Sequence, residues 1–528
     1  MGDAVDVLIV GGGPVGLATA VECARHGLTC VLVEKHPGTS IFPKARLVTT
    51  RTMELVRAWG LQDEVEAAGL PREDSLAVGV GSSLIADDFR RQGAAIAEDA
   101  PHSPTYAYIC AQDKFEVILK AHAESQPGAD IRFGVRMVGL TQDADGVTAE
   151  LSTGESVRAR YCVAADGARS GVRDALGIGV DGPPPIGHMI SVMFDADLVP
   201  LLEGRMCALY FIRSAIPCAV EAVDNKRRWM IQTGYDPAEG GSAEDFTPEF
   251  CVEVVRAAVG VPDLEVSLVG IMPWLQQAVT AQRFRSGRIF LAGDAAHVST
   301  PQGGFGMNCG IQDAHNLVWK LAAVLRGKAG ESLLDTYEAE RHPVGARTVE
   351  ESLANAFITF RMMEGELTLK ESIEQQAGRR SSEGLVLGFH YDSSAVLPDG
   401  SPAPAPEDPY RTYVPCARPG HRAPHVWLSR EGRELSTLDL LGPGFTLLAP
   451  AGSGWSRAAA ELGLPAAEIS ADGAGALVSP TWAKEYGLGP TGAVLVRPDG
   501  HVAWRVADGQ ASPDTLRRAV DTVLARNA

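Results

Sequence analysis

The sequence lacks the features that would assign it to several other classes of protein. Its nine cysteines are scattered over 528 residues, and none of them forms a CxxC pair or a zinc-ligand spacing with histidine. This pattern favours reduced, buried thiols in a cytoplasmic protein over a disulfide framework, and no metal site is expected. The first residues, MGDAVD, carry no basic segment, which argues against a secretory signal. The apolar stretch that follows is too rich in glycine to predict a membrane span.

Basic residues are also in deficit, with 47 Lys and Arg against 66 Asp and Glu and a net charge of -19. A surface this acidic repels the phosphates of nucleic acids and anionic lipid headgroups, so neither is an expected partner. The composition is otherwise that of an ordinary globular protein, with 45% hydrophobic and 21% charged residues. An anionic cofactor would therefore be held by backbone donors or by a few local cations.

The pattern of apolar residues predicts a doubly wound α/β protein with an inserted sheet. A buried strand at 5–10, a glycine turn, a helix at 15–26 and a second strand at 28–34 form one βαβ unit. Between about 187 and 275, short alternating runs predict an antiparallel sheet. We expect a discontinuous α/β domain at 1–185 and 276–392, and an inserted domain at 186–275 that residues 75–105 join. A proline-rich linker at 393–410 and a small α/β unit at 411–528 follow.

A glycine-rich loop follows the first strand and reads Gly11-Gly12-Gly13-Pro14-Val15-Gly16. In this G-x-G-x-x-G pattern the glycines allow a tight turn, close approach of a diphosphate and close packing of helix on strand. The positive end of the helix would hold the diphosphate. Glu34, with Lys35 beside it, ends the second strand, where a carboxylate binds the ribose hydroxyls of a dinucleotide. This motif alone does not distinguish FAD from NAD.

A second strand–turn–helix unit lies far along the chain. The strand in RIFLAGDAAH, 288–297, leads to Gly293 and Asp294, and the segment from Pro301 to Asn308 then opens another helix. Asp294 could bind a polyol hydroxyl. The backbone donors of Gly306, Met307 and Asn308 could face a polarised carbonyl group.

With both motifs in this order, nearly the whole chain resembles the class A FAD-dependent aromatic monooxygenases, which include para-hydroxybenzoate hydroxylase, phenol hydroxylases and aromatic polyketide hydroxylases. The resemblance implies a Rossmann-like FAD-binding domain, an inserted antiparallel-sheet substrate domain and a C-terminal thioredoxin-like domain, here without CxxC. It places the ribityl chain of FAD on Gly293 and Asp294 and Pro301 beside the flavin ring. It places Gly306, Met307 and Asn308 at the pyrimidine edge of that ring.

Three further positions carry over from the family. Asp166, in CVAADGARSGVR, matches a fingerprint that supports FAD and the transient nicotinamide, although capping of a helix is the alternative. Gln112 matches a glutamine near the diphosphate. A cation between 44 and 51 matches an arginine that approaches the flavin; Arg46 is favoured over Lys44 and Arg51, and a surface charge cluster is the alternative.

The resemblance implies hydroxylation of an aromatic ring through a flavin hydroperoxide, with NADPH or NADH and molecular oxygen as co-substrates. The substrate would be a polyketide-type intermediate or a smaller phenol or hydroxypyridine, and no general base is identified. Baeyer–Villiger insertion, epoxidation or simple oxidation by the same flavin, and a flavin-binding protein without turnover, are the alternatives. A homodimer is left open. Aromatic residues of the inserted sheet are candidate substrate contacts, with core packing as the alternative: Phe194, Tyr210, Phe211, Trp229 and Trp274.

Overall fold

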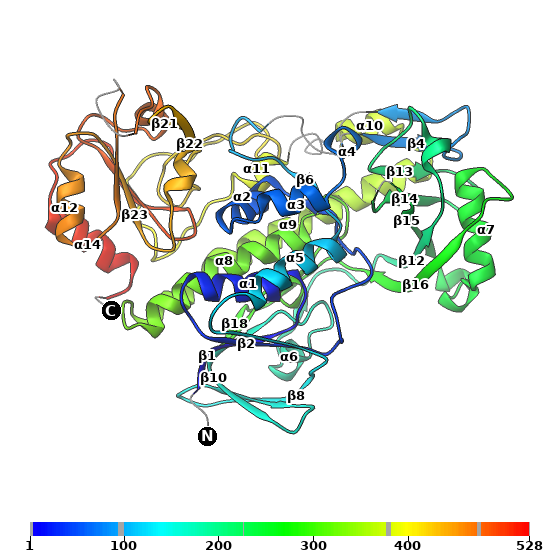
Figure 1. The fold of residues 1–528 in the computed structure, drawn as a ribbon, viewed down its shortest axis with the longest axis horizontal. Coiled ribbons are helices and arrows are strands. Elements are labelled where there is room, and N and C mark those ends of the chain that lie inside the picture. The colour runs from blue at the N-terminus through cyan, green and yellow to red at the C-terminus, as the bar shows by residue number, and fades with distance from the viewer. Residues whose placement is uncertain are drawn as a thin grey trace.

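The computed structural model describes residues 4–75, 77–92, 100–224, 226–375, 382–471 and 477–526. Three sheet-containing parts are joined through a set of central helices (Figure 1). This architecture confirms the expected fold class. Among the residues that the model describes, no helix combines the length and the apolar character needed to cross a bilayer.

The central sheet is mainly parallel, as a doubly wound fold requires. Its strands at 5–10, 30–34 and 289–291 are nearly continuous apolar runs because both of their faces are buried. The order is β18-β19-β10-β1-β2-β7, and the β8–β9 hairpin extends β10. The strands are β1 (Val5–Val10), β2 (Cys30–Glu34), β7 (Ala129–Phe133), β8 (Met137–Gln142), β9 (Val147–Leu151), β10 (Ser156–Ala164), β18 (Arg285–Ser286) and β19 (Ile289–Leu291).

The helices of this part follow from local signals in the sequence. Helix α1 (Pro14–Arg25) starts with proline, whose fixed φ suits a first turn. Helix α8 (Gly306–Leu325) packs against α1 and against the long helix α9 (Asp335–Met363). The remaining helices of the first 386 residues are α2 (Thr50–Ala58), α3 (Gln62–Ala68), α4 (Arg72–Ser75), α5 (Gln112–Glu124), α6 (Gly171–Ala175), α7 (Pro248–Val259), α10 (Leu369–Gln375) and α11 (Glu383–Val386).

The second sheet contains the inserted strands and lies at the right of Figure 1. All neighbours in it are antiparallel except β13 and β4, which pair in parallel. One face packs against α7, where Ile190, Val192 and Phe194 meet Val254 and Val255. The order is β16 (Ser267–Gln276), β12 (Gly187–Asp195), β15 (Arg228–Tyr235), β14 (Cys218–Ala222), β13 (Leu209–Ile212), β4 (Val78–Gly81) and β5 (Arg90–Gln92). We call this the substrate sheet.

Short strand pairs connect these parts. They are β3 (Leu47–Val48) with β6 (Tyr108–Ile109), and β11 (Val180–Asp181) with β17 (Val279–Ala281) and β20 (His297–Val298). The C-terminal unit has the sheet order β24 (Ala466–Ile469), β23 (Thr446–Pro450), β25 (Ala493–Val496) and β26 (Val502–Val506). Around it lie β21 (Trp427–Arg430), β22 (Arg433–Ser436), α12 (Trp455–Glu461), α13 (Trp482–Glu485) and α14 (Pro513–Val523).

A buried network of charges joins the C-terminal unit to α8 and α9. Arg497 donates two hydrogen bonds to Glu340, at 2.6 and 2.8 Å, and also binds Asp499. Lys320 Nζ lies 2.7 Å from the Glu340 carboxylate. All four side chains are at most 1% exposed. Such a network stabilises only when every member is present, so the C-terminal unit is packed as an integral part of the molecule.

Candidate active site

The first glycine loop has the geometry of a dinucleotide cradle. Gly11 has a φ of +109°, and an added Cβ would lie 2.2 Å from the carbonyl oxygen of Ala165. A Cβ at Gly16 would lie 1.9 Å from the Gly11 carbonyl oxygen, whereas a Cβ at Gly13 would meet nothing within 4 Å. Gly11 and Gly16 are therefore required by packing, and Gly13 faces open space at the start of α1. This is the arrangement that a diphosphate needs.

The GD turn lies between the first turns of α1 and α8. A Cβ at Gly293 would lie 2.8 Å from Val15 of α1, and one at Gly310 would lie 2.5 Å from the same side chain. Asp294 lies close to the start of α8, since a Cβ at Gly306 would be 3.8 Å from its Oδ1. The two helix starts and the Asp294 carboxylate therefore face one region, as a cofactor bound at both ends requires.

Neither helix start is closed by a side chain of the described chain. Gly13 and Phe305 are the N-cap residues of α1 and α8, without a side-chain cap bond and without an acidic residue in the first turn. The first amide groups of both helices thus remain available to an anionic ligand. Asp294 is exposed, but the protein atoms packed around it displace part of its water and raise the pKa of its carboxyl; the charges of His297 and Lys44 only partly oppose this rise.

Several predicted residues use their side chains within the protein. Asn308 donates to the carbonyl oxygens of Leu47 and Gly304, at 2.8 and 2.7 Å, and accepts from the Thr49 amide, so only its backbone N–H remains for a ligand. Gln112 accepts from the Ala45 amide and donates to Glu116.

The acidic candidates also have protein partners. Glu34 accepts from the amides of Gly12 and His36 at 2.8 Å, and it closes the first loop. Asp166 accepts from Ser170 and from the Val172 amide at the start of α6, which is the capping arrangement that the sequence left as the alternative. Lys35 and Pro301 are exposed. Contact of any of these residues with FAD stays a prediction.

Arg46 is bound to the substrate sheet. Its guanidinium lies 2.8 Å from Glu221 and donates to the carbonyl oxygens of Ala208 and Ala222. Arg51 instead binds Glu54 and the Asp499 carbonyl oxygen. The remaining cation of this segment, Lys44, is exposed and its charge acts on Asp294. Of the three cations in this segment, Lys44, which the sequence did not favour, is the one whose charge acts on the Asp294 carboxyl.

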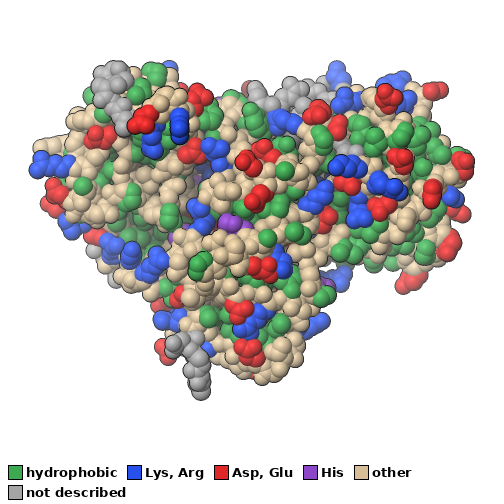
Figure 2. All heavy atoms as spheres, viewed as in Figure 1, with side chains coloured by type: hydrophobic (Ala, Val, Ile, Leu, Met, Phe, Trp, Pro, Cys, Tyr) green, Lys and Arg blue, Asp and Glu red, His purple; other side chains and the backbone are tan. Residues whose placement is uncertain are grey.

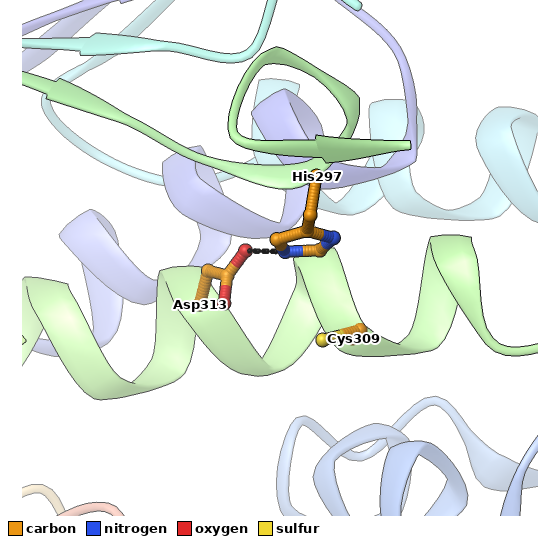
Figure 3. Close-up of side chains that lie close together, drawn as sticks. All are labelled: His297, Cys309 and Asp313. Atoms are coloured by element: carbon orange, nitrogen blue, oxygen red, sulfur yellow. Dashed lines mark hydrogen bonds and ion pairs between the residues drawn. The ribbon is translucent and has the colours of Figure 1, made fainter. Parts of the chain in front are cut away.

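Behind the GD turn, three buried side chains point toward one another (Figure 3): His297, Cys309 and Asp313, here called the His297 cluster. Asp313 Oδ2 lies 2.7 Å from His297 Nε2 and accepts from the Gly293 amide at 3.0 Å. Asp313 Oδ1 accepts from Arg341 at 2.7 Å, and Arg341 also reaches Cys309. The buried carboxylate of Asp313 therefore holds the His297 ring in place.

The charges of the His297 cluster depend on one another. Burial alone would lower the pKa of His297, but Cys309 and Asp313 raise it well above its ordinary value. Burial would raise the pKa of Asp313, but His297 and Arg341 lower it. The guanidinium of Arg341 thus already supplies the positive charge that a metal ion would bring, and the cluster serves to hold the GD turn through Gly293.

The substrate sheet turns its other face, away from α7, toward the cofactor-binding part. Gln276 donates to Gln302, next to Pro301, at 2.9 Å, and Met230 packs with Phe42 and Ala111. Phe194, Tyr210 and Trp229 instead belong to the α7 core, which is the packing alternative left open by the sequence. Phe211 packs against Met362 and Leu367, whereas Trp274 is half-buried on the facing side. Strand alternation also places Met189, Ser191 and Gln232 on this side, and none of them was predicted from the sequence.

Comparison with known proteins agrees with this geometry. A family model for the FAD-binding domain matches residues 4–352, and one for the C-terminal part of aromatic-ring hydroxylases matches residues 417–527. The chain is 41% identical to a tetracenomycin A2 monooxygenase-dioxygenase of Streptomyces glaucescens, covering 99% of this chain and 97% of the relative. It is also 41% identical to the aklavinone 12-hydroxylase RdmE of Streptomyces purpurascens, covering 99% of both.

Solved structures give the same result. A ternary complex of aklavinone-11 hydroxylase with FAD and aklavinone superposes with a TM-score of 0.87 at 38% identity, over 99% of this chain and 100% of the other. The flavin-dependent monooxygenase PieE, solved with FAD and substrate, superposes with a TM-score of 0.87 at 32% identity, over 99% and 100%. The chain therefore belongs to the class A FAD-dependent aromatic monooxygenases. It is an FAD enzyme that hydroxylates an aromatic ring.

Proposed function

We propose that this enzyme hydroxylates a phenolic, fused-ring intermediate of the aromatic polyketide type, using molecular oxygen and NADPH or NADH. The observation that carries the proposal is the convergence of two uncapped helix starts on the GD turn. The relatives that act on tetracenomycin and aklavinone precursors support the substrate class.

When bound, FAD supplies the redox chemistry, taking a hydride from the nicotinamide and activating oxygen for transfer to the ring. The residues of the chain would hold and shield it. Gly13 would receive the diphosphate, and Asp294 the hydroxyls of the ribityl chain. The amides of Gly306 to Asn308 would stabilise negative charge at the edge of the reduced ring. Lys44 is the cation that we assign beside this site.

The remaining site residues would keep the reaction away from water. Arg46 ties the flavin-side segment to the substrate sheet, and the contact between Gln276 and Gln302 ties the same sheet to the loop after Pro301. These links would fix the distance between the substrate sheet and the cofactor. Such links would help to exclude water, from which a reactive oxygen species must be protected. Dimerisation stays a prediction.

The test is turnover of the purified protein with isotope-labelled oxygen. We expect a yellow protein with one FAD per chain, phenol-dependent oxidation of NADPH or NADH, and one labelled oxygen atom in the hydroxylated product. A protein that binds FAD but oxidises neither nicotinamide with any fused-ring phenol would refute the proposal. A product without the label would show oxidation instead of hydroxylation, and a ring-expanded lactone would show Baeyer–Villiger insertion.

A further inference from the structure

The side chains on the facing side of the substrate sheet form two rows across its strands. Ala219, Gln232, Ser191 and Met272 align in one row, and Gly234, Met189 and Trp274 align in the next. All of them except Ser191, which is buried, are at least partly exposed. Ala219 packs against the cluster of Phe211 and Met362, so the open part of this row covers three strands. Three strands span about 10 Å at the usual strand spacing, which is wider than a single benzene ring. The surface is therefore large enough for a flat molecule of several fused rings.

These rows lie between two contacts with the cofactor-binding part. On one side Met230 packs against Phe42 and Ala111, and on the other Gln276 binds Gln302. Gln232 is two residues beyond Met230 on β15, so its side chain leaves the sheet on the same side. The rows therefore lie, partly exposed, between these two contacts.

The charged side chains that the structure describes on this face already have partners within the protein. Arg213, which follows β13, donates to the carbonyl oxygen of Leu367 at 3.2 Å. Glu221 lies 2.8 Å from Arg46, and Asp195 lies 2.9 Å from Arg228. The charge of the nearby Lys44 acts on acidic groups of the cofactor-binding part. A carboxylate brought onto the rows would lose its water without gaining a free cation, which is strongly unfavourable.

The polar groups on the rows differ in their availability. The indole N–H of Trp274 donates to the Ser191 hydroxyl at 3.0 Å, which fixes both side chains. The amide of Gln232 makes no hydrogen bond to any residue that the structure describes, and it offers both a donor and an acceptor. The thioether groups of Met189 and Met272 suit contact with an aromatic face.

We infer that this enzyme selects an uncharged fused-ring aromatic molecule without a carboxylate, and that the Gln232 amide recognises a carbonyl or hydroxyl group on it. The inference rests on the proposed function and specifies its substrate class. A hydrogen bond at one position and exclusion of charge everywhere else would orient the rings on the sheet. Gln232 is thus a residue that determines specificity and takes no part in oxygen activation.

The test compares two anthraquinones that share one scaffold. Chrysophanol is neutral, and rhein carries a carboxylate in place of its methyl group. Binding to the FAD-loaded protein is followed by the change in flavin absorbance at neutral pH. We expect chrysophanol to bind at least about tenfold more tightly than rhein, the effect of one poorly compensated polar group. Equal or tighter binding of rhein would overturn the inference.

Variants at position 232 sharpen the test. Gln232→Leu should weaken chrysophanol binding by about three- to tenfold, the effect of one neutral hydrogen bond. Gln232→Arg should shift the preference toward rhein by about tenfold, because a free cation then faces the carboxylate. Gln126→Leu, which removes a surface glutamine after α5, serves as the matched control and should change neither ligand. Unchanged ligand preferences in both Gln232 variants would overturn the assignment of Gln232.

The outcome remains separable from that of the proposed function. FAD content and phenol-dependent oxidation of NADPH or NADH are measured on the same preparations. Normal turnover with tight binding of rhein contradicts the inference about charge and leaves the monooxygenase function intact. Absence of turnover in wild type contradicts the proposed function itself. The FAD content of each variant shows that it has folded.

Discussion

Alanine at Gly13 and alanine at Gly16 should have different consequences, although both residues belong to one glycine loop. Gly13 has a φ of -75°, which any residue adopts, and its added Cβ would meet nothing within 4 Å. The folded protein without cofactor should accept Gly13→Ala with a change of less than about 0.5 kcal/mol in the free energy of unfolding. At Gly16 the new Cβ would lie 1.9 Å from a carbonyl oxygen, so the backbone itself must shift.

The expected loss at Gly13 is confined to the cofactor. A methyl group inserted into a close contact costs about 1–3 kcal/mol. If the diphosphate rests on Gly13, the dissociation constant of FAD should rise by about 5- to 150-fold. Gly16→Ala should lower the stability of the cofactor-free protein and, through it, the yield of folded enzyme.

Two measurements on cofactor-free protein decide between these effects. Thermal unfolding reports the fold, and titration with FAD followed by quenching of flavin fluorescence reports the affinity. Stable Gly13→Ala protein that binds FAD as tightly as wild type would refute the placement of the diphosphate on this loop. Gly16→Ala protein as stable as wild type would refute the packing argument for the third glycine.

Three further predictions concern charge. Arg497→Met should lower the free energy of unfolding by about 3–5 kcal/mol, because it leaves buried carboxylates without their main partner. Arg457→Met is the control: its side chain is 90% exposed, and the unfolding temperature should not change. Burial alone would raise the pKa of Glu22, but His315 and neighbouring cations lower it to about 2 from 4.5. Its stabilisation is therefore present above pH 4.5 and lost toward pH 2, and the unfolding temperatures of wild type and Glu22→Gln should converge on acidification; a constant difference would contradict this. Zinc should not raise the unfolding temperature, and a chelator should not lower it, because the Arg341 guanidinium already supplies a positive charge to the His297 cluster. Stabilisation by zinc would show a metal site instead.

The parts of the site that could be predicted are those defined by residues that are close together in the sequence. A strand, a glycine turn and a helix in direct succession define both the first loop and the GD turn, whatever the rest of the chain does. The substrate sheet was predicted as a sheet, but its facing side was not. In HMISVMFD, period-two alternation groups Phe194 with Ile190 and Val192, and groups Met189, Ser191 and Met193 on the opposite side. The alternation is therefore readable in the sequence, and large aromatic side chains alone do not identify the facing side.

Partners that meet across long stretches of chain could not be predicted in the same way. Glu340 and Arg497 are 157 positions apart, and nothing in the surroundings of either residue identifies the other. The surface charges do not identify such partners either, because acidic and basic side chains are interspersed over the face shown in Figure 2. A basic side chain in this sequence therefore has many acidic residues that could be its partner. Only packing decides which of them it meets.

Helix α8 shows why these distant partners matter for the chemistry. Its first turn faces the GD turn, Asp313 two turns later holds Gly293, and Lys320 near its end lies in the buried network with Arg497. One rigid element thus connects the cofactor site to the C-terminal unit. A weakened contact at Arg497 would free the far end of the helix whose start we assign to the flavin. In this arrangement the C-terminal unit, whose sequence contains no CxxC pair, contributes to the enzyme by keeping α8 in place.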